Sequence, residues 1–163
     1  MKIKLGSLLA TIVGVALLAG PQVSTQAANI ITGAEGCQPL TYLGYLPAPN
    51  EIGHVHGGVH NTNPDRPLDV VCTIPRSPRT TDTGGIFYVD GDNFNGASTT
   101  CVLYSYDYTG TYLGQTSATS FDAHFDMALT LPAAQVPTWA YISIRCTLPP
   151  HSNGLLRGVA SVQ

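Results

Sequence analysis

The chain has 163 residues and a mass of 17.2 kDa, which is enough for one domain. Hydrophobic residues make up 44% of the sequence and charged residues only 10%, a balance that excludes an intrinsically disordered chain. Ten acidic residues outnumber seven basic ones, so the formal net charge is −3 and the composition predicts no nucleic-acid partner.

Residues 1–27 have the pattern of a secretory signal peptide. Two lysines near the start precede an apolar stretch of about 15 residues, shorter than the roughly 20 that span a bilayer as a helix. Thr25-Gln26-Ala27 places small residues at the −3 and −1 positions of a cleavage site. We therefore expect a secreted domain, residues 28–163, in the periplasm or outside the cell, with no membrane anchor after cleavage.

Cleavage after Ala27 changes the charge of the chain. It removes both lysines and leaves five arginines against ten carboxylates, a formal charge of −5 on 136 residues. A chain of this size buries about two thirds of its unfolded surface, which is enough for one core.

Short segments with alternating apolar and polar residues follow, separated by Gly, Pro, Asn and Asp. In Trp139–Leu148, for example, the even-numbered residues are apolar or cysteine and form one face. The predicted strands are Ile52–His60, Leu68–Ile74, Ile86–Asp90, Thr99–Tyr108, Tyr112–Thr119, Ala123–Leu131, Trp139–Leu148 and Leu155–Val162. About eight short strands at this spacing predict an all-β fold, a single antiparallel β-sandwich with jelly-roll or immunoglobulin-like topology.

The four cysteines are Cys37, Cys72, Cys101 and Cys146. An exported chain meets an oxidising compartment, so we expect two disulfides. Of the three pairings that four cysteines allow, we favour Cys37–Cys72 and Cys101–Cys146. The strand cysteines share the apolar faces, and sequential pairing closes two independent loops. A zinc site is the alternative, but no Cys-x-x-Cys or Cys-x-His spacing supports it.

Four short blocks occur in a familiar order: Gly58–Asn61, Val70–Arg76, Ile86–Asp92 leading to Cys101–Leu103, and Tyr141–Pro149, which ends in Cys146-Thr147-Leu148-Pro149. This order resembles a set of small exported bacterial proteins with two disulfides. They tend to show a Gly-x-x-Asn turn, a Val-x-Cys-Pro-Ile-x-Arg strand and a late Cys-x-Leu-Pro strand. Thr73 stands where the second motif usually has Pro. The resemblance runs from about Cys37 onward and implies a secreted β-sandwich, but no activity or ligand.

Three histidines, His54, His56 and His60, have the same parity within one predicted strand. On a regular strand their imidazoles would line one face, where they could bind Zn²⁺ or Cu²⁺. Gly57-Gly58 argues against this, because a turn or bulge there would break the parity. The alternatives are therefore a metal-binding protein, with an enzymatic role left open, and a polar edge strand that binds nothing.

Tyrosines form the second candidate site. Tyr104, Tyr106 and Tyr108 alternate with the inward face that carries Cys101, so they should point outward, and Tyr112 follows just across a turn. Exposed aromatic rings on a flat sheet can stack on sugars or contact a protein partner. The alternative is cross-strand aromatic packing, which stabilises a sheet without binding a ligand.

The segment Asp90–Gly96 carries side-chain oxygens at several positions, which suggests a calcium loop. Phe94 occupies the fifth position of the EF-hand pattern, and the glycine comes one place late. A loop between two strands is therefore the simpler expectation.

Catalytic signatures are absent from the sequence. It has no Gly-x-Ser-x-Gly elbow, no phosphate-binding glycine loop before a helix and no His-Glu-x-x-His. Asp122 and Asp126 share parity with His124 on one predicted strand. The alternatives there are a catalytic aspartate pair, which depends on the distance between the two carboxylates, and a solvated strand face. We therefore expect a non-enzymatic secreted protein without a cofactor, which binds carbohydrate or protein at the cell surface. A metal-binding protein and a structural subunit of an extracellular assembly are the alternatives.

Overall fold

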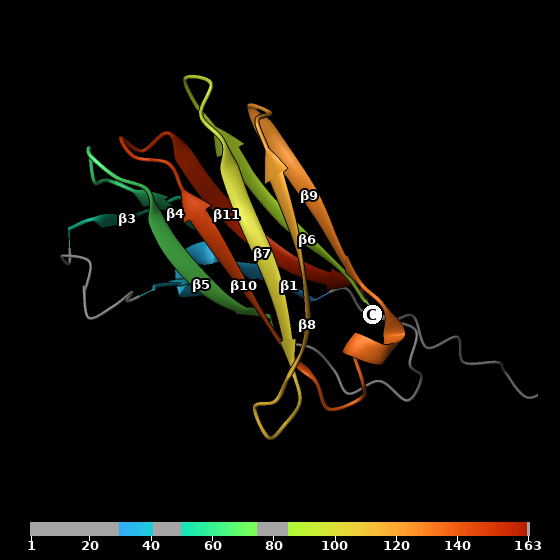
Figure 1. The fold of residues 1–163 in the computed structure, drawn as a ribbon. Coiled ribbons are helices and arrows are strands. Elements are labelled where there is room, and N and C mark those ends of the chain that lie inside the picture. The colour runs from blue at the N-terminus through green and yellow to red at the C-terminus, as the bar shows by residue number, and fades with distance from the viewer. Residues whose placement is uncertain (1–29, 41–49, 75–84, 163) are drawn as a thin grey trace, which may run out of the picture.

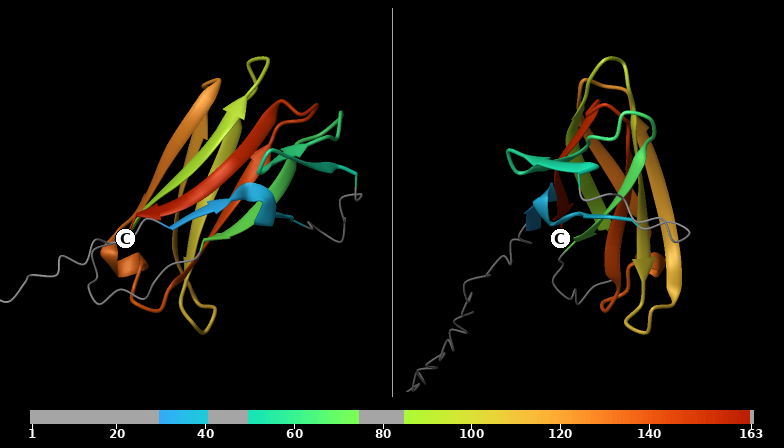
Figure 2. Two further views of the ribbon diagram at one scale, coloured as in Figure 1. Left: turned by 180° about the vertical axis from the view of Figure 1, so that it is seen from behind. Right: turned by 90° about the vertical axis from the view of Figure 1, so that its left-hand side faces the viewer.

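The computed structural model describes residues 30–40, 50–74 and 85–162. The expected signal peptide, residues 1–27, lies outside this part of the chain. Within it, β-strands form two antiparallel sheets that pack face to face (Figures 1 and 2). No helix in the described part is long and apolar enough to cross a membrane.

The two sheets differ in size. The six-stranded sheet runs in the order β3 (Ile52–Val55), β4 (Gly58–Asn61), β11 (Gly154–Val162), β6 (Gly85–Asn93) and β9 (His124–Leu131), and β1 (Ile30–Gly33) also pairs with β11. The five-stranded sheet has the order β2 (Gln38–Pro39), β5 (Leu68–Ile74), β10 (Tyr141–Leu148), β7 (Thr99–Tyr106) and β8 (Tyr112–Ser120).

The strand order is that of a jelly roll. Strands β4 to β11 pair as β4 with β11, β5 with β10, β6 with β9 and β7 with β8. This ribbon of antiparallel pairs folds over so that successive pairs alternate between two four-stranded layers, to which β1, β2 and β3 add. The predicted β-sandwich is thus confirmed, with jelly-roll rather than immunoglobulin-like topology.

One strand prediction is wrong and two strands were not predicted. The segment Ile52–His60 is a hairpin of β3 and β4, because His56 and Gly57 have φ angles of 47° and 80° and reverse the chain. The short strands β1 and β2 lack an alternating pattern that would have revealed them. Gly58–Asn61, expected as a turn from the resemblance, is strand β4.

Alternation along each strand separates the core from the surface. In β10, Ile142, Ile144, Cys146 and Leu148 are buried while the residues between them are half-buried. The inner faces of both sheets contribute to one apolar cluster, whose largest members include Leu103, Leu129 and Leu156. Burial of these faces is the main driving force for the sandwich.

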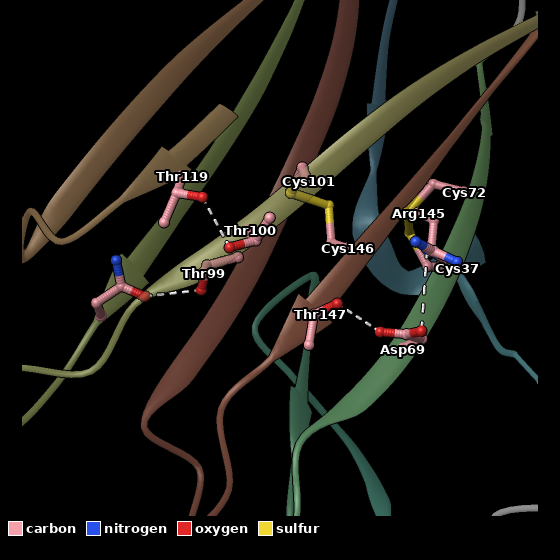
Figure 3. The surroundings of a disulfide bond; sticks show 11 residues. Cys37, Asp69, Cys72, Thr99, Thr100, Cys101, Thr119, Arg145, Cys146 and Thr147 are labelled. Carbon is pink, nitrogen blue, oxygen red and sulfur yellow. Dashed lines mark hydrogen bonds and ion pairs between the residues drawn. A yellow bond between two sulfur atoms is a disulfide. The ribbon is translucent and has the colours of Figure 1, made fainter. Parts of the chain in front are cut away.

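Both predicted disulfides are present, and both lie within the five-stranded sheet (Figure 3). Cys101 of β7 is the direct register partner of Cys146 of β10, with Cα atoms 4.1 Å apart. Cys37 precedes β2 and joins Cys72 of β5 at a Cα separation of 4.3 Å. All four cysteines are buried, so one bridge joins β7 to β10 and the other joins the residue before β2 to β5, both on the core side of the sheet.

Removing the central disulfide should destabilise the fold. The double variant Cys101→Ala/Cys146→Ala frees a segment with a sequence separation of 45 residues, which should lower the free energy of unfolding by about 2–5 kcal/mol. Urea unfolding followed by circular dichroism measures this change. The control is Thr100→Ala/Thr119→Ala, an exposed hydrogen-bonded pair on β7 and β8 that should change stability by about 1 kcal/mol at most. A loss no larger than that of the control would contradict the prediction.

Candidate functional site

Four tyrosines meet on the outer face of the five-stranded sheet. Tyr106 of β7 is the register partner of Tyr141 in β10 on one side and of Tyr112 in β8 on the other. Tyr104 lies two residues earlier on β7, so it shares the same face. The predicted grouping of Tyr104, Tyr106 and Tyr112 is thus present, and Tyr141 joins it.

The rings of these tyrosines pack against one another, although Tyr112 and Tyr141 remain 52% and 45% exposed. Tyr106 stacks on Tyr141 with centroids 5.2 Å apart and planes inclined by 18°, and it meets Tyr112 edge to face at 6.0 Å. Tyr104 lies 6.4 Å from Tyr106, and the guanidinium of Arg145 lies 5.7 Å from the centroid of the Tyr104 ring. Burial raises the pKa of Tyr106, and the neighbouring tyrosines raise it further. This part of the face is cross-strand aromatic packing.

Tyr108 does not lie on the strand, contrary to prediction. Strand β7 ends at Tyr106, and Tyr108 occupies the turn to β8, where its side chain is 79% exposed. The carbonyl of Asp107 accepts a 3.0 Å bond from the amide of Gly110, and Gly110 has a φ of 88°, which favours glycine. The turn thus holds the Tyr108 ring away from the other tyrosines.

Asp107 fixes this turn through one oxygen of its side chain. Its Oδ1 accepts bonds from the amides of Thr109 (2.8 Å) and Thr111 (2.9 Å) and from the hydroxyl of Thr109 (2.6 Å). The hydrogen bond from the Thr109 hydroxyl, followed by the backbone bond from Thr111, holds the pKa of Asp107 below its ordinary value. The carboxylate is therefore ionised at neutral pH.

A second turn brings Trp139 to the same end of the sandwich. Its indole is 67% exposed, and the turn is closed by a 2.9 Å bond from the amide of Ala140 to the carbonyl of Pro137. The preceding 3-10 helix, Ala133–Gln135, is seated on β8, because a Cβ at Gly114 would lie 2.2 Å from the Gln135 side chain. Only a glycine lets that side chain approach the strand so closely.

The two turns border a cavity of about 340 Å³ that is open to solvent and is lined by Asp107, Tyr108, Pro137, Thr138 and Trp139. They lie side by side at one end of the molecule in every view (Figures 1 and 2). The exposed rings of Tyr108 and Trp139 and the partly exposed rings of Tyr112 and Tyr141 surround this end. We call the cavity residues, with Tyr112 and Tyr141, the aromatic end.

Trp139 and Tyr141 were not among the predicted site residues. Both alternate with the inward residues of the predicted strand Trp139–Leu148, so their outward direction was visible in the sequence. What the pattern does not show is that the turn carrying Trp139 lies beside the turn carrying Tyr108. The aromatic end can stack a flat, partly apolar ligand and bond its polar groups.

The three histidines do not line one face. The turn at His56-Gly57 breaks the parity: His60 is the partner of Gly53 and His54 that of Val59, so the two side chains point to opposite faces of the hairpin. Burial, then the neighbouring His54, lowers the pKa of His60. Within the described residues no group of three His, Cys, Asp or Glu side chains is placed to hold a metal ion. Binding of Zn²⁺ or Cu²⁺ by these histidines stays a prediction.

A polar cluster lies on the outer face of the six-stranded sheet. The buried carboxylate of Asp92 bonds His124 and Arg157. Burial raises the pKa of Asp92, but the bonds from these two partners and their charges outweigh it, and the net pKa is lowered. Asn93 points the other way and binds Thr99, so the oxygens of Asp90–Gly96 do not converge on one point. The cluster of Asp92, His124 and Arg157 is an ion-pair network.

Asp122, expected on the same strand face as His124 and Asp126, lies before β9 rather than within it.

The fold and the site together define a jelly-roll β-sandwich with an aromatic cavity at one end. No family model matches the sequence, and no curated protein does. Among solved structures, the CBM36-1 domain of a multidomain xylanase from the hindgut metagenome of Trinervitermes trinervoides aligns with a TM-score of 0.43 and 12% identity, over 83% of this chain and 98% of that domain.

Two other solved structures align to a similar extent. A family 35 carbohydrate-binding module from Clostridium thermocellum has a TM-score of 0.43 and 10% identity, over 83% of this chain and 98% of the module. TmCBM61, solved with β-1,4-galactotriose, has a TM-score of 0.41 and 10% identity, over 85% of this chain and 90% of its own. At such scores the alignments do not locate a ligand or a binding residue in this chain.

The turn at Asp107 should respond to acid. Because its pKa is lowered in the folded state, the carboxylate stabilises the turn at pH values above the ordinary aspartate pKa. That stabilisation is lost as the pH falls through the lowered pKa. Titration of the Asp107 carboxyl carbon by NMR should give a midpoint below the ordinary value, and Thr109→Val should raise it. Thr138→Val, which removes a cavity hydroxyl that does not bond Asp107, is the control. If the midpoint of the wild type equals the ordinary aspartate value and Thr109→Val leaves it unchanged, the prediction is contradicted.

Proposed function

We propose that the chain is a secreted, non-enzymatic carbohydrate-binding protein and that the aromatic end is its binding site. The observation that carries the proposal is the cavity between the two turns, where two strongly exposed aromatic rings stand beside a carboxylate and a hydroxyl. The two disulfides and the signal-peptide pattern support export.

The chemistry of the cavity suits a sugar. A pyranose ring has a C–H face that packs against an aromatic ring and hydroxyl groups around its edge. Tyr108 and Trp139 offer large apolar surfaces at low entropic cost, and Asp107 and Thr138 offer partners for the hydroxyls. A few polar groups set into a mostly apolar surface are what fix the orientation of a small ligand.

The site is also largely preformed. Each turn is closed by a backbone hydrogen bond between its first and fourth residues, and Asp107 adds three more bonds to the first turn. A ligand would therefore meet rings whose backbone is already ordered, which reduces the entropy lost on binding.

The size of the cavity favours a small ligand or a segment of a chain over a protein partner. At about 340 Å³ it falls within the range of small-molecule pockets, roughly 300–1,000 Å³. A stable protein interface needs about 800 Å² on each partner. The tyrosines beside the cavity use part of their ring surface to pack on one another, so that part is not available to a protein partner. A metal-binding role and a role as a structural subunit stay predictions.

Truncating the exposed rings should weaken sugar binding. We expect Trp139→Ala and Tyr108→Ala each to raise the Kd at least about tenfold, because losing a central aromatic contact costs about 1.4 kcal/mol or more. The measurement is a glycan array, followed by affinity electrophoresis in gels containing glucomannan, β-1,4-galactan or mixed-linkage β-glucan.

The matched control is Phe121→Ala. Phe121 is 72% exposed but follows β8 at its other end, away from the cavity, so its removal should leave the Kd unchanged. Equal losses in all three variants, or no binding of any glycan by the wild type, would contradict the proposal.

A further inference from the structure

We infer that the aromatic end selects uncharged sugar chains and rejects uronic-acid and sulfated ones, and that Asp107 is the residue that determines this specificity. The inference rests on the proposed function and adds the charge of the ligand to it.

The turn uses one oxygen of Asp107 and leaves the other available. All three hydrogen bonds to the side chain go to Oδ1. Oδ2 accepts none of these three bonds, although the Thr111 hydroxyl adds a further side-chain interaction with the carboxylate, and Asp107 lines the cavity. The turn therefore holds a carboxylate in a fixed position, with one acceptor oxygen left for a ligand.

No cation in the described part of the chain compensates this charge at the cavity. Asp107 is the one charged residue among its lining residues. The described arginines lie outside the lining and pair with carboxylates, Arg66 with Glu51, Arg145 with Asp69 and Arg157 with Asp92. Arg145 also lies over the Tyr104 ring on the neighbouring part of the sheet. Arg76 and Arg79 lie outside the described residues.

These facts set the chemistry of the ligand. Sugar hydroxyls can donate to Oδ2, and a bond to an ionised acceptor is stronger than one to a neutral acceptor. A ligand carboxylate or sulfate at the same place would meet a like charge and would have no cationic partner among the described lining residues. Specificity of this kind depends on repulsion of the wrong ligand as much as on attraction of the right one.

The test compares two forms of the same polymers. Glucomannan, β-1,4-galactan and mixed-linkage β-glucan are each used as the neutral polymer and after oxidation of their primary hydroxyls to carboxylates. For the wild type in low salt we expect the oxidised form of a bound polymer to have a Kd at least about fivefold higher, and the difference to shrink near 1 M salt, where charges are screened within about 3 Å.

Asp107→Asn separates charge from shape. Asparagine keeps the Oδ1 acceptor that holds the turn but loses the charge, so the preference for the neutral polymer should fall below twofold. Asp65→Asn is the control for net charge, because Asp65 lies in the loop between β4 and β5 at the other end of the sheet, and the preference should stay.

Each outcome decides the matter. Loss of the preference in Asp107→Asn alone supports the inference. Binding that needs Trp139 but shows no charge preference in the wild type, or an equal loss in Asp65→Asn, overturns the inference and leaves the proposed function standing. Absence of binding to every glycan, on the array and in the gels, overturns both.

Discussion

The register of β7 against β10 is the constraint on which the surface of this protein depends. The disulfide between Cys101 and Cys146 joins residues that are direct partners on the core side of the sheet. Because side chains alternate along a strand, this pairing places Tyr104 and Tyr106 on the outer face and sets Tyr106 opposite Tyr141. A slip of one residue would bury the tyrosines and expose the core, so the bridge and the apolar face together determine where the aromatic side chains lie.

At the aromatic end, the aromatic side chains on the strands and those on the turns differ in packing and exposure. The tyrosines on the strands pack on one another and form a rigid base, while the most exposed rings, Tyr108 and Trp139, are carried by turns. The jelly-roll order brings these turns together, because β7 and β10 are neighbours in the sheet and run in opposite directions. The end of β7 and the start of β10 must then lie at the same edge. Ligand-contacting side chains on short turns above a rigid sheet are a common arrangement in β proteins.

Much of the fold follows from local rules that can be applied to the sequence. Period-two alternation identified strands β5 to β11 of the jelly roll, and inward-facing cysteines indicated the disulfide pairing. The segment Ile52–His60 was predicted as one strand because the alternation of histidines continues through it. Gly57-Gly58 marked a possible turn, but the sequence did not show that His56 also takes a positive φ and that the chain reverses there. The cavity was missed because it depends on the contact of two turns that are distant in sequence. Only the sheet order brings Trp139 beside Tyr108.

The position of Trp139 also gives the molecule a spectroscopic property. It is the single tryptophan in the chain, and its indole lines the cavity while remaining 67% exposed. All indole fluorescence therefore originates at the candidate site and none from the core. An indole in water emits at longer wavelength than one that is covered, so the emission maximum reports directly on whether the cavity is occupied. Unfolding of the sandwich, by contrast, should change that emission little, and the two events can be distinguished in one native protein without a label.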